Sequence, residues 1–194
     1  MRSIGLKVAL ALASASTGSR ATLAAALDGP GGIEVTESLD AGGQSGSARA
    51  EVTIRARREV VWSLITSCAE AMSLVPGLEE CRVLETAPDG SWQRIRHVLD
   101  YSWYLPRLTY EFRASYNYPA RVSIERVSGD LTTLRASWDL SSADGSTRAD
   151  YSVALVPGFW VPRWLVRAAL RRDLPKMLRA LQERAESVQA RNSG

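Results

Sequence analysis

The stretch Leu108-Thr-Tyr-Glu-Phe-Arg-Ala-Ser-Tyr116 alternates apolar and polar side chains along its whole length. Successive side chains of a β-strand point to opposite faces, so this period of two predicts a strand with one buried face and one solvent face. Residues 134–140 and 149–155 repeat the pattern. Turns rich in Pro, Gly and Asp separate such stretches, and short connections of this kind favour antiparallel neighbours.

The same patterns extend outward from this stretch in both directions. We expect strands at residues 48–56, 79–86, 91–103, 107–117, 120–128, 131–141 and 146–156. Two short helices are predicted after the first strand, at residues 57–66 and 68–74, and the proline and glycine of Pro76-Gly77 end the second one.

The C-terminal residues 162–189 predict one long amphipathic helix. Its apolar stripe consists of Val166, Leu170, Leu174, Met177, Leu178, Leu181, Ala185 and Val188. Pro175 removes one backbone donor and should kink this helix, unless a new helix begins at Asp173. The apolar sheet face and the apolar helix stripe must cover each other, so the expected fold class is α+β, an antiparallel sheet covered by the last helix.

The 194 residues suit a single domain preceded by a short leader. Residues 1–26 contain three basic residues, no acidic residue and a short apolar run, an order typical of a secretory signal. We therefore expect an exported protein of the periplasm or envelope; a transit peptide, or an over-long start of a cytoplasmic chain, is the alternative. Residues 27–47 read as a linker that could hold a short strand, and residues 48–190 as the domain.

The charge of the chain resides in this leader. The formal net charge is +3, and Arg2, Lys7 and Arg20 account for all of it. The remainder is neutral, whereas a nucleic-acid-binding domain carries clustered positive charge. No nucleic-acid partner is expected.

The residues that most enzyme classes require are scarce. The chain has one histidine and two cysteines, which excludes a multi-histidine metal centre and a four-cysteine zinc site. It contains no nucleophile elbow and no glycine-rich phosphate loop before a helix. We expect no metal, no cofactor and no catalytic residue. Cys68 and Cys81 could form one disulfide in an exported chain, but two buried thiols are the favoured interpretation.

Several aromatic and polar residues allow two interpretations each. His97 shares a strand face with Ile95 and Leu99, so it is either a hydrogen-bonded core residue or a polar group inside a ligand cavity. The inward tyrosines allow the same choice. Two aromatic-rich turns either cap the core or form a cavity mouth that touches a membrane surface transiently. These turn residues are Trp103, Tyr104, Phe159, Trp160 and Trp164.

Four of these stretches resemble a known superfamily. They are residues 50–56, Leu74-Val-Pro-Gly77, Cys81-Arg-Val-Leu-Glu85 and Leu134-Arg-Ala-Ser-Trp-Asp-Leu140. They are similar to the START-like helix-grip (SRPBCC) superfamily, closest to its coenzyme Q-binding and polyketide cyclase/dehydrase branch, over residues 48–188. The resemblance implies a curved antiparallel sheet wrapped around a long C-terminal helix, with an apolar cavity between them. Relatives bind lipids, quinones, sterols or polyketides there, and a minority catalyse ring closure.

The alternation predicts which side chains face such a cavity. The candidates are Ile95, His97, Leu99, Tyr110, Phe112, Val122, Ile124, Trp138 and Tyr151 on the sheet, facing Leu165, Ala168 and Ala169 on the helix. The predicted function is binding or carriage of a hydrophobic small molecule such as a quinone, lipid or polyketide. The alternatives are an aromatase/cyclase-like enzyme that uses His97 or a tyrosine as acid or base, and a protein-interaction module.

Overall fold

The computed structural model describes residues 33–39, 45–101 and 107–193. Eight strands, four α-helices and one π-helical segment follow one another along this part of the chain. In order they are β1 (Glu34–Leu39), β2 (Gly46–Ile54), α1 (Arg58–Ile65), α2 (Cys68–Leu74), β3 (Leu78–Thr86), β4 (Trp92–Leu99), β5 (Leu108–Asn117), β6 (Arg121–Gly129), β7 (Leu131–Ala143), β8 (Ser146–Pro157), α3 (Arg163–Ala168), a π-helical segment (Ala169–Asp173) and α4 (Leu174–Asn192).

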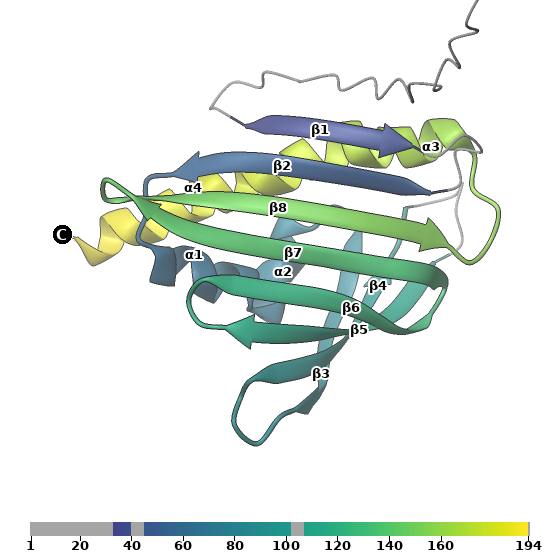
Figure 1. Cartoon of the computed structure of the whole chain (residues 1–194), viewed down its shortest axis with the longest axis horizontal. Coiled ribbons are helices and arrows are strands. Elements are labelled where there is room, and N and C mark those ends of the chain that lie inside the picture. The colour runs from purple at the N-terminus through teal and green to yellow at the C-terminus, as the bar shows by residue number, and fades with distance from the viewer. Residues whose placement is uncertain (1–32, 40–44, 102–106, 194) are drawn as a thin grey trace, which may run out of the picture.

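All eight strands form one sheet in the order β1-β2-β8-β7-β6-β5-β4-β3, and every neighbouring pair is antiparallel. The helices lie together against one face of this sheet, with α4 running along it (Figure 1). This arrangement confirms the predicted α+β helix-grip class. Residues 27–47, predicted as a linker that could hold a short strand, contain β1, which pairs with β2 at the sheet edge, so the sheet begins before residue 48.

The core lies between the sheet and α4. On β5, Phe112 and Ala114 are buried while Arg113 and Ser115 are exposed, as the alternation predicts. The helix contributes its stripe of Leu174, Leu178, Leu181 and Ala185, all buried. Among the described residues no helix is long and apolar enough to cross a membrane.

A new helix begins after Asp173, which was the predicted alternative to a kink at Pro175. The π-helical segment precedes α4, Asp173 occupies the N-cap position of α4, and Pro175 falls in its first turn. An amide at that position has no intrahelical partner, so proline is tolerated there. The π-helical segment carries Arg171, which forms an ion pair with the buried carboxylate of Glu37 on β1.

The prediction of two buried thiols is wrong, because Cys68 and Cys81 form a disulfide. Cys68 is the first residue of α2 and Cys81 lies within β3, and their Cα atoms are 5.2 Å apart. This separation lies in the ordinary range for a disulfide. The tight turn at residues 75–77 folds β3 back beside α2, which brings the two cysteines together. A second difference concerns β4, which ends at Leu99 rather than at residue 103.

Replacing Leu178 by alanine should destabilise the fold strongly. Leu178 is 0% exposed, so truncation leaves a cavity between α4 and the sheet and should lower the free energy of unfolding by about 2–5 kcal/mol. Urea unfolding followed by circular dichroism measures the change. Met72→Ala is the matched control, because Met72 is 42% exposed and its truncation should have a small effect. An equal loss of unfolding free energy in the two variants would contradict this assignment of the core.

Candidate functional site

A cavity of about 160 Å³ lies between the sheet and the helices. Its walls come from the segment 64–75, from inward-facing residues of β3 to β8, and from two residues of α4. The lining is mostly apolar, and it includes three alanines, Ala71, Ala114 and Ala136. Small side chains on three separate elements leave a space that larger ones would fill.

The structure brings eight of the predicted site residues together around this cavity. They are Ile95, His97, Tyr110, Phe112, Val122, Ile124, Trp138 and Tyr151. Leu99 is buried but does not line the cavity. The period of two identified these residues because the sheet presents a single inward face.

The predicted helical wall differs from the observed one. Leu165 is buried in a separate cluster with Val161 and Val166, and Ala168 does not line the cavity. Ala169 belongs to the π-helical segment, and its side chain lies outside what the structure describes. Met177 and Leu181 of α4 form the wall instead, because the cavity lies beside α4, beyond the π-helical segment.

The wall that α1 and α2 form was not predicted from the sequence. Eight of the 23 lining residues lie between Leu64 and Val75, and the Cys68–Cys81 disulfide contributes both of its cysteines. The helical spacing of Leu64 and Ile65 does indicate one apolar face. That spacing alone cannot distinguish a face that meets a packed core from one that meets a cavity.

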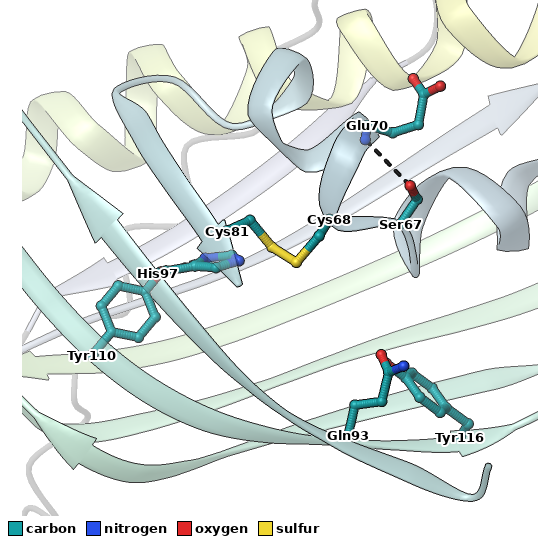
Figure 2. Close-up of a disulfide and its surroundings, with 8 residues drawn as sticks. All are labelled: Ser67, Cys68, Glu70, Cys81, Gln93, His97, Tyr110 and Tyr116. Atoms are coloured by element: carbon teal, nitrogen blue, oxygen red, sulfur yellow. Dashed lines mark hydrogen bonds between the residues drawn. A yellow bond between two sulfur atoms is a disulfide. The ribbon is translucent and has the colours of Figure 1, made fainter. Parts of the chain in front are cut away.

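Polar groups face this apolar space from the sheet. His97 Nδ1 lies 3.3 Å from the hydroxyl oxygen of Tyr110, in hydrogen-bond contact. The Tyr116 hydroxyl donates to Oε1 of Gln93 at 2.9 Å. Figure 2 shows the His97 ring between Tyr110 and Cys81, its partner across the β3–β4 pair.

Tyr151 differs from the other two tyrosines. Its ring packs against Trp138 with centroids 4.4 Å apart, and its side chain lines the cavity. Among the described residues its hydroxyl has no hydrogen-bond partner. A hydroxyl that faces the cavity in this way can donate a hydrogen bond to an acceptor on a bound molecule.

Burial keeps the side chains of His97, Tyr110 and Tyr151 neutral near pH 7. It lowers the pKa of His97 to about 4, because the imidazolium form would be poorly solvated. Burial also raises the pKa of Tyr110, and the nearby Tyr151 and Tyr101 raise it further. The pKa of Tyr151 is raised by burial as well. The cavity therefore offers hydrogen bonds but no formal charge.

The size of the cavity limits what it can hold in this conformation. An apolar cavity of about 150 Å³ accommodates benzene, whereas drug-sized ligands occupy about 300–1,000 Å³. A larger hollow of about 510 Å³ lies on the opposite face of the sheet. Its lining includes the exposed Arg49, Arg121 and Arg135, so it is an open, polar surface and a poor enclosure for an apolar molecule.

The three predicted mouth residues that the structure describes do not line this cavity. Trp160 and Trp164 are 75% and 64% exposed, and Phe159 is partly buried against the cluster of Val161, Leu165 and Val166. Trp103 and Tyr104 lie outside the described residues.

Solved structures share this fold at low sequence identity. The STAR-related lipid transfer protein from Xanthomonas axonopodis superposes with a TM-score of 0.67 at 19% identity, over 81% of this chain and 95% of that chain. The Zhui aromatase/cyclase from Streptomyces sp. R1128 superposes with a TM-score of 0.59 at 15% identity, over 77% of this chain and 96% of that chain. Human STARD10 superposes with a TM-score of 0.68 at 10% identity, over 83% of this chain and 72% of that chain.

A search of the curated proteins finds no match to this sequence. The family model described as polyketide cyclase / dehydrase and lipid transport matches residues 54–182, about two thirds of the chain. The match covers α1, α2, the strands from β3 to β8 and the first part of α4, which together form the cavity. The START-like resemblance is thereby confirmed, and the chain belongs to the polyketide cyclase/dehydrase and lipid transport family.

Proposed function

We propose that this protein binds and carries a lipophilic small molecule whose buried part is a single oxygen-substituted ring, as in a quinone or a phenol. The observation that carries the proposal is the Tyr151 hydroxyl, which lies in an apolar cavity without a partner among the described residues. A carbonyl oxygen at that place would accept the hydrogen bond. The apolar lining would contribute about 25 cal/mol for each Å² of apolar surface removed from water.

Binding suits these polar groups better than catalysis does. General acid–base catalysis works best when the pKa of the catalyst lies near the working pH. His97, with a pKa of about 4, is a weak base, and burial makes Tyr110 and Tyr151 weak acids. Neutral groups of this kind orient a ligand through hydrogen bonds.

The protein surface around α3 suits contact with an anionic membrane. Among the described residues, Trp160 and Trp164 are the two tryptophans with highly exposed side chains, and indole rings favour the membrane–water boundary. Residues 157–181 contain six basic residues and one acidic residue. Arg167, Arg172 and Lys176 among them are exposed and would attract anionic lipid heads. The proposed occupant of this surface is an anionic phospholipid bilayer from which the ligand is loaded.

The proposed function includes export of the protein. Residues 1–26 contain basic residues, no acidic residue and a short apolar run, as a secretory signal does, and disulfides such as Cys68–Cys81 persist in oxidising compartments. The proposed location is the periplasm or envelope.

The histidine should titrate at an unusually low pH. Because His97 is the only histidine, its ring protons can be followed in the NMR spectrum, with an expected midpoint near pH 4 instead of about 6.5. Between pH 4 and pH 6.5 the unfolded state binds more protons at His97 than the folded state does. Neutral His97 therefore contributes about 3 kcal/mol to the free energy of unfolding above about pH 6.5, and this contribution is lost as the pH falls toward 4. Urea-unfolded protein is the control. A midpoint near 6.5 in the folded protein would contradict the burial of this ring.

Removing the Tyr151 hydroxyl should weaken binding of a carbonyl ligand only. Acetophenone and α-methylstyrene have matching shapes, because the second replaces the carbonyl oxygen by a CH₂ group, but only the first has an acceptor. Tyr151→Phe should lower the affinity for acetophenone by about tenfold and leave that for α-methylstyrene nearly unchanged. Calorimetry measures both affinities. Tyr116→Phe is the matched control, since that hydroxyl already donates to Gln93. Equal effects on the two probes would argue against a hydrogen-bonding role, and no binding of either would refute the proposed function.

Replacing both exposed tryptophans should weaken membrane binding. In co-sedimentation with equimolar phosphatidylglycerol and phosphatidylcholine vesicles, the Trp160→Ala/Trp164→Ala variant should bind at least about tenfold less tightly than the unaltered protein. Pure phosphatidylcholine should bind poorly, and added salt should weaken binding to the anionic vesicles. Tyr118→Ala is the control, because Tyr118 is 65% exposed on a different turn. Unchanged binding by the double variant would exclude this surface.

A further inference from the structure

Helix α2 and the turn before it close one side of the cavity. Leu64 to Val75 supply eight of the 23 lining residues, including Cys68, Ala71 and Leu74 on α2 itself. Ser67 caps this helix, accepting a hydrogen bond from the backbone amide of Glu70 at 3.3 Å (Figure 2). Any ligand larger than the present space must displace some part of the wall.

This part of the wall has little apolar support. Leu74 is the single buried residue that α2 contributes, and Met72 points outward at 42% exposure. Strand β3, against which α2 lies, is at the sheet edge and buries only Leu78. By contrast, α4 buries four residues of its stripe. Weak packing marks the elements that move at the lowest free-energy cost.

Two other contacts hold α2 in place. Glu70 accepts hydrogen bonds from Nε and Nη2 of Arg184 on α4, at 2.9 and 2.8 Å, and this contact lowers the pKa of Glu70. Both side chains are partly exposed, and ion pairs in water contribute little to stability. The second contact is the Cys68–Cys81 disulfide, a covalent bond that water and salt do not weaken.

We infer that the Cys68–Cys81 disulfide determines the largest ligand that the cavity admits. While the disulfide is intact, α2 stays against β3 and the cavity accepts a single ring. After reduction, α2 is held mainly by an exposed ion pair and by Leu74, and it can move outward to admit larger molecules. This inference rests on the proposed function.

The chemical step is ordinary thiol–disulfide exchange. A thiolate of an external dithiol attacks one sulfur, the other leaves as a thiolate, and the second thiol of the reductant resolves the mixed disulfide. The products are two cysteine thiols and the oxidised reductant. Cys68 and Cys81 are only partly buried, so a reductant can reach them. The turn between α2 and β3 contains Gly77 at a φ of +76°, a conformation that glycine adopts readily.

Two probes of different size test this inference. Acetophenone represents one ring, and N-phenyl-1-naphthylamine, whose fluorescence rises in apolar surroundings, represents a ligand too large for the present cavity. Reduction with dithiothreitol should change the affinity for acetophenone by less than about twofold. The same treatment should raise the affinity for N-phenyl-1-naphthylamine by about tenfold or more. Acetophenone should displace the larger probe. The Cys68→Ser/Cys81→Ser variant should behave as the reduced protein does, with or without reductant.

A matched control separates the disulfide from the ion pair. Glu70→Gln removes the charge that faces Arg184 but keeps the disulfide, so it should not admit the larger probe. If that variant binds N-phenyl-1-naphthylamine as the reduced protein does, the ion pair is the restraint and the inference is overturned. An unchanged affinity after reduction overturns it as well. In both cases acetophenone binding still supports the proposed function, whereas no binding of either probe refutes both.

Hydrogen exchange shows whether reduction acts locally. Amides of residues 68–75 should exchange faster in the reduced protein, while those of β7 and β8 should keep their protection. Faster exchange throughout the sheet would overturn the inference, because the disulfide would then stabilise the whole fold. This measurement uses the reduced wild-type chain and does not depend on whether the Cys68→Ser/Cys81→Ser variant folds.

Discussion

Contact between the apolar stripe of α4 and the sheet is the constraint on which the rest of the structure depends. A single sheet with one apolar face needs a cover, and Leu174, Leu178 and Leu181 supply it. A straight helix covers only part of a broad, twisted sheet. Helix α4 packs on β2 and on α1 and α2, so these two short helices complete the cover toward β3. The cavity is the space that remains between these surfaces.

The polar groups of the cavity follow from the same geometry. Alternation places Tyr110 and Tyr151 on the inward face, where their rings fill volume and their hydroxyls enter an apolar space. Tyr110 reaches His97, whereas Tyr151 has no such neighbour among the described residues. Burial keeps these groups uncharged, so an apolar ligand can approach without removing water from an ion. Recognition in such a site depends on hydrogen bonds and shape.

The sequence predicted the strands and the helix that are buried on one side only, because apolar and polar residues alternate with a regular period along such elements. The inward residues of β5 and β7 could be found in this way, and so could the stripe of α4. The helical wall could not, because the π-helical segment interrupts the regular helical spacing between Leu165, which was predicted to face the cavity, and Leu181, which lines it. The disulfide could not either: 13 positions of sequence separation do not define a distance until the turn before Leu78 is known. Strand β1 lies where the sequence allowed a short strand, but its pairing with β2 could not be predicted from so few residues.

Space that side chains leave in a core has a cost that bears on its role. Closed voids cost about 24 cal/mol per Å³, so such space lowers stability relative to a packed core. Larger side chains at Ala114 or Ala136 would remove much of that cost, yet the chain has alanine at both positions. The disulfide between Cys68 and Cys81 offsets part of the loss by restricting the unfolded chain. A ligand that fills the cavity recovers the missing contacts, so ligand occupancy and folding stability are coupled in this domain.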